Sequence, residues 1–178
     1  IVEAADILAR RGNPARFRMV GPGYEWILRS VEAKGLSSLF EFTGPVEYRQ
    51  VPELIRSCSV VLAPFDPSRD PFMRQRGFIF SPLKIFEYMS LAKAIVATDV
   101  EKVRDVLSDG RTAIMVSPSS PPDLAAAIES LIEHPPTVIR LGKRARTAVA
   151  NSFSWERLSA VVNHVLSQAY KTHRAETG

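Results

Sequence analysis

The segment Ser81-Pro82-Leu83-Lys84 has the composition of an anion site at the start of a helix. Serine is a favoured N-cap and proline is favoured at the first helical position, so a helix is predicted to begin here. Its first turn would offer free backbone amides at Leu83 and Lys84, and the lysine charge adds to the helix dipole. We therefore expect a phosphate site. An ordinary helix start with a surface lysine is the alternative.

Glu87 follows Leu83 by one helical turn, on a segment whose other residues are mostly apolar. It should therefore be partly buried, and a buried carboxylate needs hydrogen-bond partners. Two sugar hydroxyls can donate to its two oxygens. The residues alone leave a second interpretation open, in which Glu87 pairs with a nearby lysine or arginine.

The stretch from Phe65 to Gly77 is longer than the connections of about 4–6 residues that are usual in compact domains. Its polar side chains are candidates for phosphate or sugar contacts. Arginines can grip a pyrophosphate by forked hydrogen bonds, and carboxylates can accept from sugar hydroxyls. These candidates are Arg69, Arg74, Arg76, Asp66 and Asp70. A solvated loop without a ligand is the alternative for each.

Five short apolar runs have the length and the β-branched or aromatic content of strands, at residues 17–20, 40–43, 60–63, 94–97 and 113–116. Helical patterns lie between them, at roughly 22–34, 50–57, 82–92 and 101–107. This alternation predicts an α/β fold with a doubly wound, Rossmann-like parallel sheet. Three further helices are expected at 121–134, 137–151 and 155–170, so that about 121–172 form a helical C-terminal part.

Ligands of an open parallel sheet bind beyond the carboxyl ends of the strands. This rule selects five segments, at 21–24, 44–48, 64–81, 99–102 and 117–120. Four of them contain Gly or Pro, as expected where the backbone turns sharply or approaches a ligand.

The first residues, Ile1 to Arg11, already show helical spacing of apolar side chains without a preceding cap. A helix that opens a doubly wound domain normally follows a strand. We therefore expect a βα unit, and a further domain, before Ile1. The 178 residues themselves fit a single domain with one sizeable core.

The net charge of +4 favours anionic partners without identifying the anion. Basic and acidic residues are interleaved except around Lys143-Arg144-Ala145-Arg146, so we expect no nucleic-acid surface. No apolar run approaches the ~20 residues of a membrane span, and the charged start differs from a signal peptide. These features predict a cytoplasmic protein.

Other site classes find little support. Cys58 is the only cysteine and adjoins an apolar run, so it is interpreted as a core residue and no internal disulfide is expected. Trp26 stands where the third glycine of a dinucleotide-binding turn would follow Gly21-x-Gly23, which disfavours an oxidoreductase. No metal site is expected because the histidines lack a cysteine or carboxylate motif. They are His134, His164 and His173.

The run from Phe80 to Ser90, followed by Lys93 to Thr98, resembles the C-terminal domain of glycosyltransferase family 4, also called group 1. The resemblance covers nearly the whole chain, including residues 21–23, 44–46, 109–110, 124–131 and 153–155. Members are retaining enzymes of the GT-B fold. The resemblance therefore implies a domain that binds a nucleoside diphosphate sugar and transfers a hexose to a glycan, lipid-linked or small-molecule acceptor held by an N-terminal domain.

The resemblance also implies roles for individual residues. Glu87 matches the second glutamate of the family's Glu-x7-Glu motif, which binds the ribose hydroxyls. The segment from Ser81 to Lys84, with Leu83, occupies the helix start that meets the donor phosphates. Val46 and the Gly21 to Gly23 turn fall where the base is held, and Tyr48 on the same segment is a further donor-binding candidate. Because helix and basic side chains stabilise the leaving diphosphate, neither a metal nor another cofactor is expected.

Two departures from the family pattern leave alternatives open. Ile79 stands where the first glutamate of the motif belongs, and it cannot accept hydrogen bonds from the donor sugar. The arginine and lysine that usually grip the phosphates would precede Ile1, so the chain alone is expected to be inactive. The alternatives are a degenerate GT-B binding or assembly module and a GT-B nucleotide-sugar epimerase. Peripheral contact of the full-length protein with the cytoplasmic face of a membrane also remains open.

Overall fold

The computed structural model describes residues 1–176, except for 24, 67, 69–70 and 77–80. Within these residues, every predicted strand is present and is short. The strands are β1 (Phe17–Met19), β2 (Phe40–Phe42), β3 (Val60–Ala63), β4 (Ala94–Thr98) and β5 (Ile114–Val116). The apolar runs therefore predicted the strands correctly.

Helices alternate with these strands as predicted. They are α1 (Val2–Arg10), α2 (Glu25–Ala33), α3 (Val51–Ser57), α4 (Pro71–Arg76), α5 (Leu83–Ser90) and α6 (Glu101–Arg104), with 3-10 turns η1 (Ser37–Leu39) and η2 (Tyr48–Gln50). The predicted C-terminal helices follow as α7 (Pro121–Glu133), α8 (Pro135–Ser152) and α9 (Trp155–Glu176). The Ser120 side chain caps α7 by accepting a hydrogen bond from the Asp123 amide.

Two connections differ from the prediction. The segment 64–81, expected as one long loop, contains the short helix α4. Its first residue is Pro71, whose fixed φ suits the start of a helix. The helix expected over 101–107 ends at Arg104, although Leu107 beyond it is buried in the core. A helix of six or four residues is too short for its apolar period to show in the sequence.

All strand pairs are parallel, which confirms the predicted α/β class. The hydrogen bonds, however, divide the strands into two sheets, β1-β2 and β3-β4-β5, rather than one continuous sheet. In the first, Phe17 lies opposite Phe40. In the second, β4 is the central strand and all five of its residues are buried. Within each sheet, the carboxyl ends of the strands share one edge, where the candidate site residues follow.

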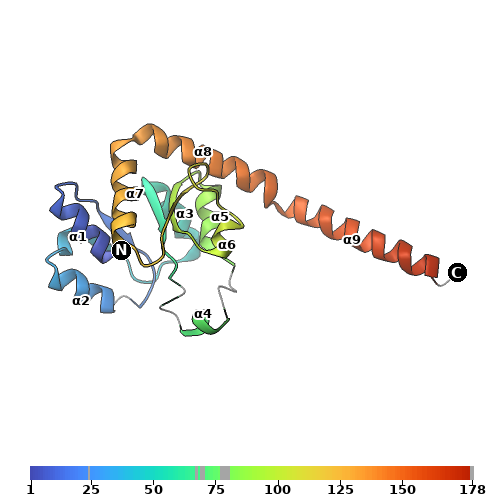
Figure 1. Ribbon diagram of the computed structural model, residues 1–178, viewed down its shortest axis with the longest axis horizontal. Helices are drawn as coiled ribbons and strands as arrows, with labels where there is room; N and C mark the ends of the chain where they lie inside the picture. Colours follow the sequence, from blue (N-terminus) through green and yellow to red (C-terminus); the bar gives the residue numbers. More distant parts are fainter. Residues whose placement is uncertain (24, 67, 69–70, 77–80, 177–178) are drawn as a thin grey trace.

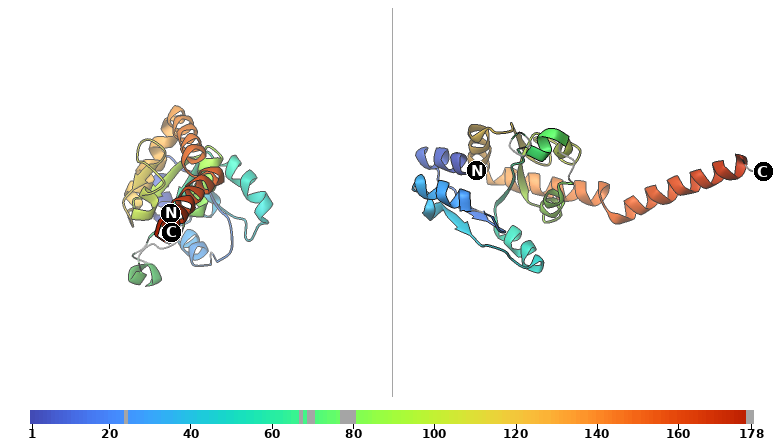
Figure 2. Two further views of the ribbon diagram at one scale, coloured as in Figure 1. Left: turned by 90° about the vertical axis from the view of Figure 1, so that its right-hand side faces the viewer. Right: turned by 90° about the horizontal axis from the view of Figure 1, so that it is seen from below.

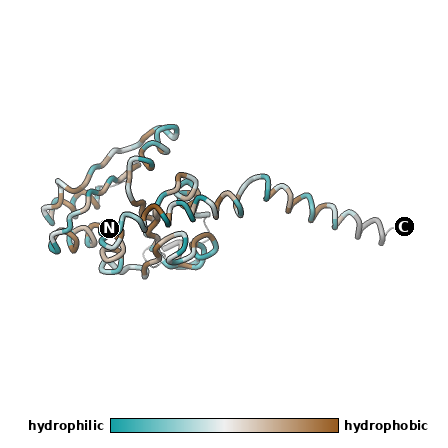
Figure 3. Tube along the Cα trace, turned by 90° about the horizontal axis from the view of Figure 1, so that it is seen from above, coloured by the Kyte–Doolittle hydropathy of each residue, from teal (hydrophilic) through white to brown (hydrophobic). Residues whose placement is uncertain are grey.

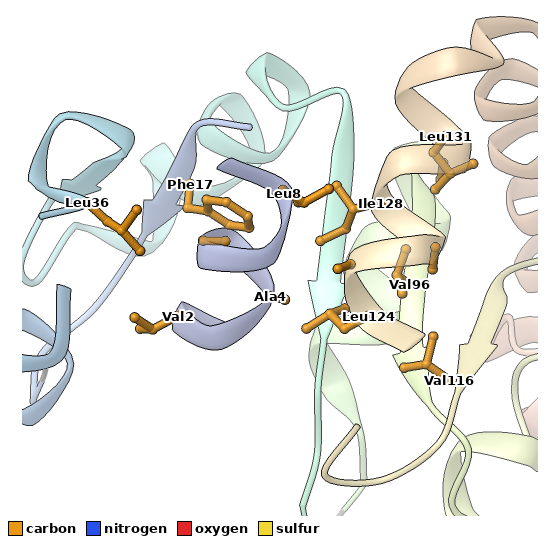
Figure 4. Packing of buried hydrophobic residues seen from close by; sticks show 14 of the residues in the cluster. Val2, Ala4, Leu8, Phe17, Leu36, Val96, Val116, Leu124, Ile128 and Leu131 are labelled. Carbon is orange, nitrogen blue, oxygen red and sulfur yellow. The ribbon is translucent and has the colours of Figure 1, made fainter. Parts of the chain in front are cut away.

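The alternating side chains of β4 separate two clusters of the core. Ala94 and Val96 pack with α1 and α7, as Figure 4 shows for Val96 beside Leu124 and Leu131. Ile95 and Ala97 face the other way and pack with residues of α5 and α8. Burial of both faces explains why β4 is an uninterrupted apolar run.

Helix α8 lies against α5 and β4 and so fixes the position of α5. The approach is close at Gly142, which is buried beside the backbone of Ala92 just after α5. Arg146 of α8 donates a hydrogen bond to the carbonyl of Ser90, the last residue of α5. The helix predicted to carry the phosphate site is therefore anchored at its carboxyl end.

Helix α9 extends away from the body of the molecule (Figures 1 and 2). Apolar and hydrophilic residues alternate along it (Figure 3). Its large apolar side chains are exposed, namely Trp155, Leu158, Val161, Val162, Val165, Leu166 and Tyr170. Among the described residues, no helix combines the length and apolar character needed to cross a membrane.

Candidate functional site

Two glycine turns meet at the carboxyl ends of β1 and β2. The Gly21 amide donates to the Gly44 carbonyl at 3.0 Å, so the two turns are joined directly. Gly21, Gly23 and Gly44 all have positive φ, at 118°, 84° and 66°, a conformation that favours glycine. The parallel pairing of β1 and β2 thus brings together the two segments that were predicted to hold the same part of a ligand.

Val46 follows these turns and lines a surface hollow of about 520 Å³. The other lining residues come from η2 and α3, namely Arg49, Gln50, Glu53 and Leu54. The segment before α3 is ordered by a capping box, in which the Glu47 amide donates to the Gln50 side chain at 3.1 Å. The lining combines the apolar side chains of Val46 and Leu54 with three polar or charged side chains, a mixture that suits a flat ring with polar edges.

Tyr48 and Glu87 are joined by a hydrogen bond across the site. The phenol of Tyr48 donates to Glu87 Oε1 at 3.0 Å, and the two residues are 39 positions apart in the chain. Glu87 is half-buried, as predicted. Glu87 makes no ion pair with any residue that the structure describes, so its predicted pairing with a lysine or arginine is not observed. The carboxylate instead raises the pKa of the Tyr48 phenol, because it accepts the phenol's hydrogen bond and opposes a second negative charge.

The prediction that Ser81 caps the helix is wrong. Helix α5 begins at Leu83, and Pro82 is its N-cap, without a side-chain hydrogen bond to the helix. The reason is a tight turn in which the Leu83 amide donates to the Ser81 carbonyl at 2.9 Å. The Leu83 amide is therefore occupied rather than free. For the Lys84 amide, no acceptor is found among the described residues, so the predicted anion site retains one amide donor.

Lys84 lies between an aromatic ring and a carboxylate. Its Nζ is 5.1 Å from the centroid of the Phe65 ring, which follows β3. Burial lowers the pKa of Lys84, while the nearby charge of Glu87 acts in the opposite direction. Phe65 is the site residue that sequence reasoning missed. Its place two residues after the end of β3 was the available signal.

Asp66, next to Phe65, links the ends of β3 and β5. One of its carboxylate oxygens accepts from the Ser68 amide at 3.1 Å and from the Ser68 hydroxyl at 2.5 Å. The other accepts from the hydroxyl of Ser119, a residue with a positive φ of 53°. Both oxygens are thus bonded within the protein. This arrangement favours a role in holding the strand-end loops over direct contact with a sugar.

Two further candidate residues lie on α4. Arg74 and Arg76 are exposed on α4, which projects below the body in Figure 1. Arg69, Asp70 and Ile79 lie outside the described residues. In the strand-end segment after β4, the Asp99 carboxylate accepts a hydrogen bond from the Arg104 side chain at 2.5 Å. This bond lowers the pKa of Asp99.

The arrangement combines a cation and an amide donor at the start of α5 with a carboxylate one turn further along. Such a set can bind a molecule that carries phosphate at one end and neighbouring hydroxyls beside it. Among the described residues, no group of three His, Cys, Asp or Glu side chains could hold a metal ion. Cys58 is half-buried against the core, and its thiol donates to the Leu54 carbonyl at 3.3 Å.

A second hollow lies at the opposite, amino-terminal ends of β3 and β4 and measures about 620 Å³. It is lined mainly by apolar side chains of α7 and α8, including Leu131, Ile132 and Ile139. Lys93 beside it is already engaged, because its Nζ donates to two carbonyls at the end of α3, at 2.6 and 2.5 Å. Lys143, an exposed residue, also lines this hollow. Unlike the edge that carries Glu87, the hollow has no carboxylate among its lining residues.

Comparison with known proteins gives a family match. A family model described as "Glycosyl transferases group 1" matches residues 1–134. The chain is also 30% identical over 155 residues to the alpha-D-kanosaminyltransferase of Streptomyces kanamyceticus. That match covers 86% of this chain and 37% of the relative, so the chain spans less than half of that protein's length.

Solved structures share the fold. The C-terminal domain of a glycosyl transferase group 1 family protein (LpcC) from Francisella tularensis matches with a TM-score of 0.69 and 17% identity, covering 86% of this chain and 77% of that one. The Anabaena protein HepE in complex with UDP matches with a TM-score of 0.73 and 19% identity, covering 93% of this chain and 44% of that one. The architecture is thus that of a GT-B C-terminal domain.

Proposed function

Because the chain belongs to the group 1 glycosyl transferases, we propose that it binds the nucleoside diphosphate sugar donor of a retaining hexosyltransferase. The observation that carries the proposal is the pair of charged side chains on the first two turns of α5. Lys84 and Glu87 lie at the strand-end edge, with their charges close enough to affect the lysine pKa. A cation for phosphate and an acceptor for hydroxyls are the two groups that a nucleoside diphosphate requires.

The diphosphate binds at the start of α5 in this proposal. The Lys84 amide and ammonium both donate there, and the helix dipole adds positive potential. Lys84 is exposed, so an anion can reach its ammonium group. The Phe65 ring restricts where the ammonium can go. The exposed guanidinium groups of Arg74 and Arg76 are further candidates for phosphate contacts.

The pentose binds at Glu87, one turn further along the helix. Its Oε1 accepts from Tyr48, and no protein donor to Oε2 is found among the described residues. A carboxylate has about four acceptor positions, so it can accept from two pentose hydroxyls while keeping the tyrosine bond. The base then occupies the hollow beside Val46, next to the joined Gly21 and Gly44 turns. The UDP complex of the structurally similar HepE supports this class of ligand.

The chemical step follows from where charge develops. As the bond between the sugar and the diphosphate breaks, negative charge grows on the phosphate oxygens. Donors fixed in advance, such as the Lys84 amide and ammonium, stabilise that charge without reorganising. We propose that no metal takes part, and that the sugar transfers with retention of configuration as the family resemblance implies.

The acceptor is held by a second domain in this proposal. The chain spans 37% of the kanosaminyltransferase relative, which leaves room for such a domain in proteins of this kind. The exposed apolar side chains of α9 supply a surface for packing against it, including Trp155 and Leu158. The chain alone is then expected to bind donor without turning it over.

Titration calorimetry of this chain with UDP, GDP and ADP tests the proposal. We expect one diphosphate to bind with a dissociation constant between about 10 µM and 1 mM, and the other two to bind more weakly. Glu87→Ala should weaken that binding, whereas the exposed Glu133→Ala on α7 should leave it unchanged. Absence of binding by all three nucleotides would instead favour the degenerate, non-catalytic module that the isoleucine at Ile79 suggests.

A further inference from the structure

Tyr48 is highly exposed and nevertheless has a defined hydrogen-bond partner. Its exposure is 76%, yet its phenol donates to Glu87 Oε1 at 3.0 Å. An exposed tyrosine has no need of a protein partner, because water can satisfy its hydroxyl. The consequence of the bond therefore lies in how it orients the Glu87 carboxylate, and not in satisfying the tyrosine hydroxyl.

The segment that carries Tyr48 is held in place independently of Glu87. The capping box between Glu47 and Gln50 closes η2 around the tyrosine, and Arg49 pairs with Glu47 at 2.5 Å. The Tyr48 backbone is thus fixed from the β2 side of the molecule, while Glu87 is fixed on α5, which α8 anchors. The phenol bond joins two elements that are each already ordered.

We propose that Tyr48 is a positioning residue that orients the Glu87 carboxylate toward two neighbouring hydroxyls of a pentose, and so makes the site selective for ribonucleotides over 2′-deoxyribonucleotides. The inference rests on the proposed function. With Oε1 held by the phenol, rotation of the carboxylate is restricted. Its remaining acceptor positions then point in fixed directions before the ligand arrives.

Selectivity follows from this restriction. A fixed carboxylate can accept from both the 2′ and the 3′ hydroxyl of ribose at once, whereas a 2′-deoxyribose supplies only one of the two donors. A carboxylate that is free to rotate loses conformational entropy when it binds both hydroxyls. Its binding free energy therefore falls by less when one hydroxyl is absent. Removing the phenol hydroxyl should therefore weaken the ribose ligand more than the deoxyribose ligand.

The opposite arrangement makes the opposite prediction. If the pentose had to displace Tyr48 from Glu87, the phenol would compete with the ligand. Loss of the hydroxyl would then strengthen nucleotide binding. The two arrangements are distinguished by the sign of one measured change.

The test uses Tyr48→Phe in the whole chain, with calorimetric titration of UDP and 2′-deoxyuridine diphosphate, or of the matching pair for whichever base binds. Phenylalanine keeps the ring and removes only the hydroxyl. We expect UDP binding to weaken about 3- to 10-fold and deoxy-UDP binding to change less than twofold, so that the preference for ribose falls. Tyr170→Phe is the matched control, because Tyr170 is also an exposed tyrosine but lies on α9. It should change the affinity for neither nucleotide.

The same titrations in the Glu87→Ala background separate the inference from the proposed function. There, Tyr48→Phe should have no further effect, because the phenol acts through the carboxylate. Unaltered UDP affinity in Glu87→Ala itself would remove the pentose role and the proposed function at this site. A clear loss in Glu87→Ala with no loss, or a gain, in Tyr48→Phe would overturn only the positioning role. An equal loss of both ligands in Tyr48→Phe would also overturn it.

Discussion

Replacing Gly142 by alanine should loosen the packing that positions α5. A Cβ at this position would lie 1.9 Å from the Ala92 carbonyl oxygen and 2.7 Å from its carbonyl carbon. Both are backbone atoms, and Ala92 is held in a left-handed conformation with φ of 54°. Neither atom can therefore shift without straining the backbone. Helix α8 would have to move away from α5 to admit the methyl group.

The magnitude follows from two opposed effects. Alanine is favoured over glycine inside a helix by about 0.5–1 kcal/mol. Overpacking of a dense core costs about 1–3 kcal/mol, and a contact this short belongs at the upper end of that range. We therefore expect Gly142→Ala to lower the free energy of unfolding by about 2 kcal/mol. For a chain of 178 residues this corresponds to a fall in melting temperature of about 4–8 °C.

Thermal unfolding followed by circular dichroism measures this change. Thr147→Ala is the matched control, because it alters an exposed position of the same helix and should shift the melting temperature by no more than about 2 °C. A melting temperature of Gly142→Ala equal to or above that of the wild type would show that α8 does not approach α5 as closely as described.

Three further predictions concern charged groups. Lys84→Met should weaken UDP binding about 10-fold while changing uridine binding less than twofold, and equal losses would contradict a phosphate contact. The variant should melt no lower than the wild type, because a lowered lysine pKa means that the folded state disfavours the charge at all pH values below about 10.5. Lys93→Met should lower the stability in urea unfolding by about 1–2 kcal/mol, since it removes the donor that caps two carbonyls at the end of α3, and an unchanged midpoint would argue against this cap. Asp6→Asn should destabilise the fold above pH 4, and the difference from the wild type should disappear only once the pH has fallen below the lowered pKa of Asp6. The bond from Arg10 lowers the Asp6 pKa below 3.8, so the contribution of the carboxylate is lost as pH falls through that lowered value, and a pH-independent difference would refute this assignment.

Local patterns predicted the elements well because they depend on neighbours in the chain. The run Ala94-Ile95-Val96-Ala97 predicted a buried strand, and the structure buries all of it at the centre of the three-stranded sheet. Pro82 illustrates the limit of the same reasoning. Residue preferences placed it inside the helix, whereas the turn from Ser81 to Leu83 placed it at the cap. Boundaries of this kind depend on a single hydrogen bond that composition does not reveal.

Contacts between distant segments could not be predicted at all. Tyr48 and Glu87 were each selected from the sequence, but their hydrogen bond depends on how η2 and α5 pack. The contact of Lys84 with Phe65 and the link between Asp66 and Ser119 have the same origin. The division of the strands into two sheets was likewise hidden, because an apolar run specifies a strand without specifying its partner.

The most direct test of a nucleotide site at the start of α5 is amide NMR of the isotopically labelled chain during titration with UDP, or with GDP or ADP if one of these binds instead. We expect saturable shifts at Lys84, Glu87 and Val46, and at the Gly21 turn, with little change near Ile132 in the hollow at the opposite edge of the sheet. Shifts confined to the region of Ile132, with none at Lys84 or Glu87, would contradict it.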